Sequence, residues 1–161
     1  MAERAAVNAS PLIFLARGGL LDLLRLAAQE IVAPAAVAAE IRRRGPEDPT
    51  VRAMEGASWL RVVETPPVPP LIQAWDLGEG ESSVLAWAYA HPGAEAIVDD
   101  LAGRRCAASL GISVRGTLGL VLMAKQRGRI VAARPVLEDM RRAGMYLSNR
   151  VLNRALALVG E

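Results

Sequence analysis

Residues 5–13 of the chain have the sequence Ala5-Ala6-Val7-Asn8-Ala9-Ser10-Pro11-Leu12-Ile13. The first three residues are small and apolar, which predicts a short buried strand that ends at the polar Asn8. Ser10 is a typical helix N-cap, and Pro11 suits the first helical position, where its missing N–H costs nothing. The segment therefore predicts a buried strand that passes directly into a helix.

Short apolar segments and helical segments continue to alternate along the rest of the chain. Further strands are predicted at 30–32, 58–63, 95–98 and 112–115. Helices are predicted at 12–17, 20–26, from Pro34 onward, at about 80–90, from 101 to 110, at 117–127, at 135–143 and at 148–159. The segment 42–49 is expected to end the helix that begins at Pro34, and the Pro-rich segment 66–70 to be an extended connector within the domain.

This alternation predicts an α/β fold with a mainly parallel sheet covered by helices on both faces. We expect a three-layer α/β/α sandwich with about four to five short strands. A length of 161 residues suits one domain, so residues 1–161 are predicted to form a single unit whose C-terminal helices run from about 135 to 159.

Composition excludes several classes of protein. Hydrophobic residues make up 52% and charged residues 22%, so the chain is neither disordered nor fibrous. No apolar run has the length of a membrane span, and the first residues do not have a signal-peptide layout, which together predict a cytoplasmic protein. The single cysteine, Cys106, has no partner for an internal disulfide.

Charge is distributed unevenly along the chain. Residues 1–100 carry 8 basic and 14 acidic side chains, whereas residues 101–161 carry 11 basic and 3 acidic ones. Two interpretations stay open: oppositely charged surfaces that favour solubility or self-association, or an acidic pocket beside an Arg-rich wall that follows a phosphate backbone.

Polar side chains stand where elements of the predicted sheet end. Asn8 follows the first strand, Asp99 and Asp100 follow the fourth, and Glu40 and Glu81 lie on helices that can lean over the same edge. Neighbouring carboxylates repel one another unless a cation neutralises them. Oxygen ligands without a His or Cys cluster suit Mg²⁺ or Mn²⁺, ions that activate water for phosphodiester hydrolysis. For each acid taken singly, a solvated surface position is the alternative.

Four motifs together resemble the PIN-domain family, in particular a prokaryotic subgroup related to VapC-type toxins. They occur in the order Val7–Ile13, Val32–Ile41, Gly78–Ala86 and Ile97–Asp100, followed by Gly103-Arg104-Arg105 and Gly116–Gly119. The resemblance implies a parallel sheet between helices, an acidic site for Mg²⁺ or Mn²⁺, and cleavage of RNA. It also implies a possible antitoxin protein as partner and a homodimer.

By this resemblance Glu40, Glu81 and Asp100 match the family's metal-binding acids, and Asp99 is a secondary candidate. Ser10 and Thr117 are auxiliary candidates, with a plain helix cap as the alternative role of each. The guanidinium groups of Arg104, Arg105 and Arg115 are candidates for contact with RNA phosphates. Asn8 departs from the pattern, because the family usually has Asp at this position.

The sequence therefore predicts a Mg²⁺- or Mn²⁺-dependent endoribonuclease in which Asn8 is an auxiliary ligand. The alternative is a PIN-like module with weakened catalysis that acts by binding nucleic acid or protein, and Asn8 is the residue that favours it. An amide oxygen can coordinate a hard cation but supplies no negative charge.

Overall fold

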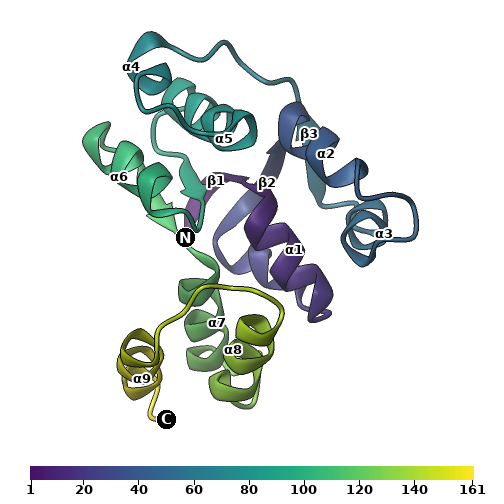
Figure 1. The fold of residues 1–161 in the computed structure, drawn as a ribbon, viewed down its shortest axis with the longest axis vertical. Coiled ribbons are helices and arrows are strands. Elements are labelled where there is room, and N and C mark those ends of the chain that lie inside the picture. The colour runs from purple at the N-terminus through teal and green to yellow at the C-terminus, as the bar shows by residue number, and fades with distance from the viewer.

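Five short strands form one sheet in which every strand runs parallel to its neighbours, in the order β3-β2-β1-β4-β5 (Figure 1). The computed structural model describes residues 1–161. The strands are β1 (Ala2–Val7), β2 (Ala28–Pro34), β3 (Leu60–Val63), β4 (Glu95–Ile97) and β5 (Ser113–Arg115). The predicted parallel α/β sandwich of four to five strands is confirmed.

Helices connect the strands and cover both faces of the sheet. They are α1 (Ala9–Arg17), the 3₁₀ helix η1 (Leu21–Leu26), α2 (Ala35–Arg42), α3 (Pro49–Gly56), α4 (Pro70–Gln73), α5 (Glu79–Ala90), α6 (Leu101–Ser109), α7 (Thr117–Gln126), α8 (Ala133–Arg142) and α9 (Asn149–Leu158). Helices α1, α2 and α3 lie on one side of the sheet, and α5 and α6 lie on the other (Figure 1). This placement follows from right-handed crossovers between parallel strands.

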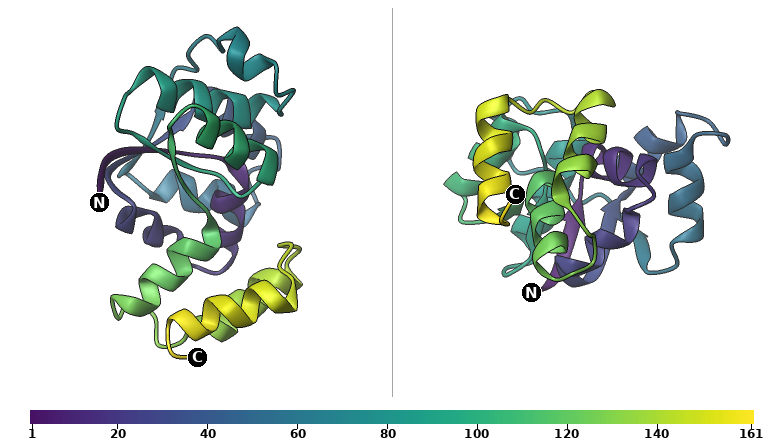
Figure 2. Two further views of the ribbon diagram at one scale, coloured as in Figure 1. Left: turned by 90° about the vertical axis from the view of Figure 1, so that its left-hand side faces the viewer. Right: turned by 90° about the horizontal axis from the view of Figure 1, so that it is seen from below.

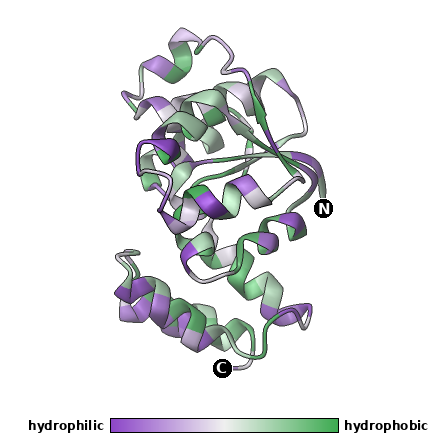
Figure 3. Cartoon of the chain, turned by 90° about the vertical axis from the view of Figure 1, so that its right-hand side faces the viewer, coloured by the Kyte–Doolittle hydropathy of each residue, from purple (hydrophilic) through white to green (hydrophobic).

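The central strands supply the middle of the core. Ala5, Ala6 and Val7 of β1 are fully buried, as are Val32 and Ala33 of β2. Small side chains here let the helices approach the sheet closely. Figure 3 shows hydrophobic residues along the middle of the strands, whereas the outer helices carry both hydrophobic and hydrophilic residues. The largest hydrophobic cluster continues into α7, α8 and α9 through Leu120, Leu137 and Leu156.

The C-terminal helices form a group at one end of the molecule. Helices α7, α8 and α9 pack against one another, and Figures 1 and 2 show them below the sheet, with α9 beside the C-terminus. They span nearly the range predicted from the sequence. No helix is both long and apolar enough to cross a bilayer.

Two helices were not predicted from the sequence, and both begin at a proline. Asp48 caps α3 by accepting a hydrogen bond from the Thr50 N–H at 2.8 Å, and Pro49 occupies the first helical turn. Helix α4 begins at Pro70, inside the segment that we expected to be extended. In both cases proline starts a helix, as its fixed φ allows, whereas the sequence interpretation treated it as a stop.

Candidate metal centre and nucleic-acid cleft

The order of the strands creates one crevice at the carboxyl edge of the sheet. From β1 the chain crosses to β2 on one side, and from β4 it crosses to β5 on the other. The ends of β1 and β4 are neighbours, since Val7 pairs with Ile97 and the Asn8 N–H donates to the Ile97 carbonyl at 3.0 Å. Parallel sheets bind ligands at such a switch point, and here it brings Asn8 next to Asp99 and Asp100.

Asn8 and Glu40 approach each other across Gly80. Asn8 is the N-cap residue of α1, but its side chain makes no capping hydrogen bond. A Cβ atom placed on Gly80 would lie 3.2 Å from Asn8 Oδ1 and 3.5 Å from Glu40 Oε2. The missing side chain at residue 80 therefore leaves a space toward which two oxygen ligands from different elements converge.

Glu81, in the first turn of α5, is the most perturbed carboxyl group of the site. Desolvation raises its pKa from 4.5 to about 7, with further contributions from the Asp100 charge, a hydrogen bond to Asp100 and the Glu40 charge. Glycine again makes the approach possible: a Cβ atom on Gly103 would lie only 3.4 Å from the Glu81 carboxyl carbon. Segments distant in sequence thus bring three acids into electrostatic contact.

Asp100 has two close neighbours, Gly103 and Glu81. It is the N-cap of α6, and its Oδ2 accepts a hydrogen bond from the Gly103 N–H at 3.2 Å. Its side chain also lies beside Glu81. The cap fixes the orientation of the carboxylate at the start of α6.

Asp99 faces a different set of groups from Asp100. Its Oδ1 accepts the Thr117 N–H at 2.7 Å, and its Oδ2 accepts the hydroxyl groups of Thr117 at 2.8 Å and Ser10 at 3.0 Å. The N-cap positions of α1 and α7 are occupied by Asn8 and Gly116, so the plain capping role expected for Ser10 and Thr117 does not hold. Asp99 instead connects β4 to the starts of α1 and α7.

Replacing Asp99 with Ala is expected to lower the free energy of unfolding by about 2–4 kcal/mol, because Thr117, which is fully buried, and Ser10 lose a charged acceptor. Chemical denaturation measures this loss. Asp22→Ala, at an exposed position in η1, is the matched control and should change stability by less than about 0.5 kcal/mol. Equal effects of the two substitutions would contradict the connecting role of Asp99.

None of the three arginines predicted to contact RNA is among the residues that line the pocket containing Asn8, Glu40 and Glu81. Arg115 Nε donates to Glu95 Oε1 at 2.7 Å, so its guanidinium group is already paired. Arg104 Nη1 would lie 2.5 Å from a Cβ atom on Gly116, which places the guanidinium group over that glycine. Arg105 is exposed on α6.

Two other arginines, Arg43 and Arg44, line the crevice and were missed from the sequence. They follow Glu40 by three and four residues, a spacing that places side chains on one face of a helical segment. This signal was available in the sequence.

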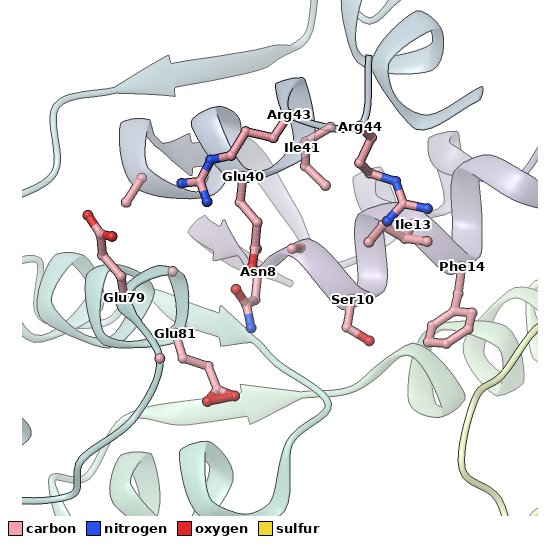
Figure 4. Close-up of a pocket in the computed structure, with 14 residues that line it drawn as sticks. Asn8, Ser10, Ile13, Phe14, Glu40, Ile41, Arg43, Arg44, Glu79 and Glu81 are labelled. Atoms are coloured by element: carbon pink, nitrogen blue, oxygen red, sulfur yellow. The ribbon is translucent and has the colours of Figure 1, made fainter. Parts of the chain in front are cut away.

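At this edge lies a cleft of about 460 Å³ (Figure 4). One end of the cleft is lined by acidic side chains and the other by aromatic and basic ones. Asn8, Glu40 and Glu81 mark the acidic end, and Phe14 and Arg44 mark the other. The complete lining comprises Asn8, Ala9, Ser10, Ile13, Phe14, Ala36, Glu40, Ile41, Arg43, Arg44, Gly78, Glu79, Gly80 and Glu81.

The chemistry of the acidic end fits a hard divalent cation. Its donors are all oxygens, and none of the ion pairs of the protein involves Glu40, Glu81 or Asp100, so their charges are not balanced by Arg or Lys. No three His, Cys, Asp or Glu side chains are close enough together to hold a metal ion as they stand. Simultaneous coordination therefore requires a rotation of side chains, for which the exposed Glu40 has room.

Fold and cleft together define a class of protein: a parallel α/β domain with carboxylate and amide side chains at the switch point of its sheet. A family model described as a PIN domain matches residues 4–161, and the chain belongs to this family. PIN domains are in general divalent-metal-dependent nucleases. No curated protein matches the sequence significantly.

Proposed function

We propose that the protein is a Mg²⁺- or Mn²⁺-dependent endoribonuclease. The observation that carries this proposal is the meeting of Glu81 with Asp100 and Glu40, from three separate helix segments, beside Asn8 at the carboxyl edge of the sheet. Unbalanced carboxylates in partial contact are unfavourable by themselves and become favourable around a cation. Membership of the PIN-domain family supports the same chemistry.

In this proposal Glu40, Glu81 and Asp100 hold the cation, and the Asn8 amide oxygen is an auxiliary ligand. A bound Mg²⁺ or Mn²⁺ supplies water activation and neutralisation of charge on the phosphodiester. Because the pKa of Glu81 is raised to about 7, part of the Glu81 carboxyl groups carry a proton near neutral pH and release it when the site takes up a cation. Asp99, with both oxygens engaged, has a positioning role: it holds the starts of α1 and α7 at the end of β4 through Ser10 and Thr117.

The test is cleavage of a mixture of short single-stranded RNAs by the purified protein with Mn²⁺, with Mg²⁺, or with a chelator. The proposal expects internal cleavage with either ion and none with the chelator. Equal cleavage in the chelator would contradict it. Retention of the RNA in a binding assay, without cleavage under any condition, would instead support the alternative, a PIN-like binding module.

The uncharged amide of Asn8 is the feature that favours the binding module. It also gives a second prediction, for the affinity of the site for Mn²⁺. Asn8→Asp adds a negative charge at the cation site and is expected to tighten Mn²⁺ binding about ten- to a hundredfold, or about 1–3 kcal/mol, in calorimetry. Asn153→Asp, on an exposed position of α9, is the matched control and should leave the affinity unchanged. Unchanged affinity of the Asn8 variant would remove Asn8 from the proposed ligand set.

Family resemblance also predicts a toxin that pairs with an antitoxin protein and forms a homodimer. Both stay predictions about this chain. Mass measurement in solution tests the dimer, and growth arrest on expression, relieved by a neighbouring gene product, tests the toxin role.

A further inference from the structure

One arginine of the cleft has no partner of opposite charge. Arg43 lines the same cleft as Glu40 and Glu79, and Figure 4 shows its guanidinium group at the end where Glu79 lies. All three side chains are exposed, and none of them takes part in an ion pair of the protein. The neighbouring Arg44, in contrast, is paired with Asp48 at 3.1 Å. Arg43 is therefore the arginine of the cleft whose charge is unbalanced.

Glu40 lies within reach of Arg43 along α2. Arg43 is the C-cap residue of this helix and keeps helical backbone angles, with φ −63° and ψ −16°. Glu40 therefore precedes it at the helical i, i+3 spacing, at which Cβ atoms lie about 5–6 Å apart and opposite charges attract each other. Rotation of the two side chains is enough to form this pair. A Glu40 carboxylate that is paired with Arg43 is less available to a cation.

Glu79 offers Arg43 a second partner, on α5. Helices α2 and α5 pack against each other, and a Cβ atom on Gly80 would lie 3.6 Å from the Val37 side chain and 3.5 Å from Glu40 Oε2. The first turn of α5 thus lies directly against the turn of α2 that carries Glu40. Glu79 immediately precedes Gly80 and lines the same cleft. Arg43 therefore has a carboxylate within reach on each of two helices.

Cation binding requires a movement of Glu40 that these two side chains can control. No three acids are close enough to hold a metal ion as they stand, so Glu40 has to rotate toward Glu81 and Asp100. We propose that Arg43 and Glu79 are positioning residues for Glu40: Arg43 competes with the cation for Glu40, and Glu79 withdraws Arg43 when Glu40 turns to the cation. In the structure Arg43 forms neither pair and stands between the two partners. This inference rests on the proposed function and adds to its site two residues that do not hold the cation.

The test measures Mn²⁺ affinity by calorimetry for wild type, Arg43→Ala, Glu79→Gln and the double variant. Arg43→Ala removes the competing charge and is expected to tighten Mn²⁺ binding about fivefold. Glu79→Gln leaves Arg43 free to pair with Glu40 and is expected to weaken binding about fivefold. In the Arg43→Ala background, Glu79→Gln should change the affinity by less than about twofold, because no guanidinium group is left to withdraw.

The double variant distinguishes this competition from the general effect of charge near the site. Additive effects of the two substitutions mean that both side chains act only through long-range charge, and they overturn the proposal. The matched control is Arg42→Ala, an exposed arginine outside the cleft, which should leave the affinity within about twofold of wild type. Equal effects of Arg42→Ala and Arg43→Ala also overturn the proposal. Thermal unfolding in a chelator verifies that each variant is folded.

Failure of this inference can be told from failure of the nuclease proposal. Mn²⁺-dependent RNA cleavage by wild type, together with additive effects of Arg43→Ala and Glu79→Gln on Mn²⁺ affinity, removes the positioning role and leaves the nuclease. Non-additive effects on the affinity without RNA cleavage by wild type leave the positioning role and remove the nuclease. A wild-type protein that does not bind Mn²⁺ contradicts both proposals.

Discussion

Asp100→Asn is expected to reduce Mn²⁺-dependent RNA cleavage by about a hundredfold or more while leaving the fold intact. The loss follows from the removal of one negative charge from the cation site, where the remaining ligands no longer neutralise the phosphodiester effectively. The fold is preserved because Asn is as good an N-cap as Asp, so the hydrogen bond from the Gly103 N–H is retained.

Asp100→Asn separates an effect on RNA cleavage from an effect on the stability of the fold. Cleavage rates at saturating RNA and thermal unfolding are measured on the same preparation, with Asp22→Asn as a control for an exposed aspartate in η1. The control should cleave like wild type. A fully active Asp100→Asn protein would show that Asp100 serves only as the cap of α6.

Glu81→Gln is expected to weaken Mn²⁺ binding about a hundredfold and yet to stabilise the metal-free protein at about pH 8. The first effect follows from loss of a charged ligand. The second follows from the pKa of Glu81, which is raised to about 7 in the folded protein by desolvation and by Asp100 and Glu40. The ionised form is therefore disfavoured in the fold, and Gln removes the charge.

The direction of the pH dependence follows from the same pKa. Between 4.5 and about 7 the folded protein keeps a proton on Glu81 that the unfolded chain has lost, so the stabilising contribution is complete below 4.5 and is lost as pH rises through about 7. Allowing for solvent screening at this partly exposed group, Glu81→Gln should gain about 1–2 kcal/mol at about pH 8, or roughly 2–6 °C in Tm.

Thermal unfolding at two pH values and two metal concentrations measures this effect. At about pH 4.5 in chelator the variant and wild type should unfold together, and at about pH 8 the variant should unfold at the higher temperature. Excess Mn²⁺ at about pH 8 should reverse the order, since wild type binds the ion more tightly and gains more binding free energy than the variant. A variant less stable than wild type in chelator at about pH 8 would contradict the unfavourable ionisation of Glu81.

The hydrophobic pattern and the Gly and Pro residues between segments were sufficient to predict the α/β architecture from the sequence. The short apolar segments at 5–7 and 30–32 indicated strands, and their alternation with helices favoured a parallel sheet, as the pairing of β1 with β2 confirms. The helices α3 and α4 were missed because proline can either end or begin a helix. At α3 the capping contact of Asp48 with Thr50 marks the start of a helix, whereas α4 begins after Pro69 without a side-chain cap.

The candidate site could be predicted less completely, because its geometry depends on contacts between distant segments. Spacing along the chain could not show that Asp99 and Asp100, although adjacent, have different partners. It also could not show that Gly80 and Gly103 allow the close approach of Glu40 and Glu81. Arg43, in contrast, was predictable from the sequence, because it follows Glu40 by three residues, a spacing that places both side chains on one face of a helix.

The central claim is that Glu81 and Asp100, from different helices, coordinate the same hard cation. Anomalous diffraction from crystals soaked in Mn²⁺ at about pH 8, above the pKa of Glu81, tests it most directly. The proposal predicts manganese density within coordination distance of both carboxylates, with Glu40 rotated toward it. Manganese bound elsewhere on a protein that cleaves RNA with Mn²⁺ in solution would contradict the claim.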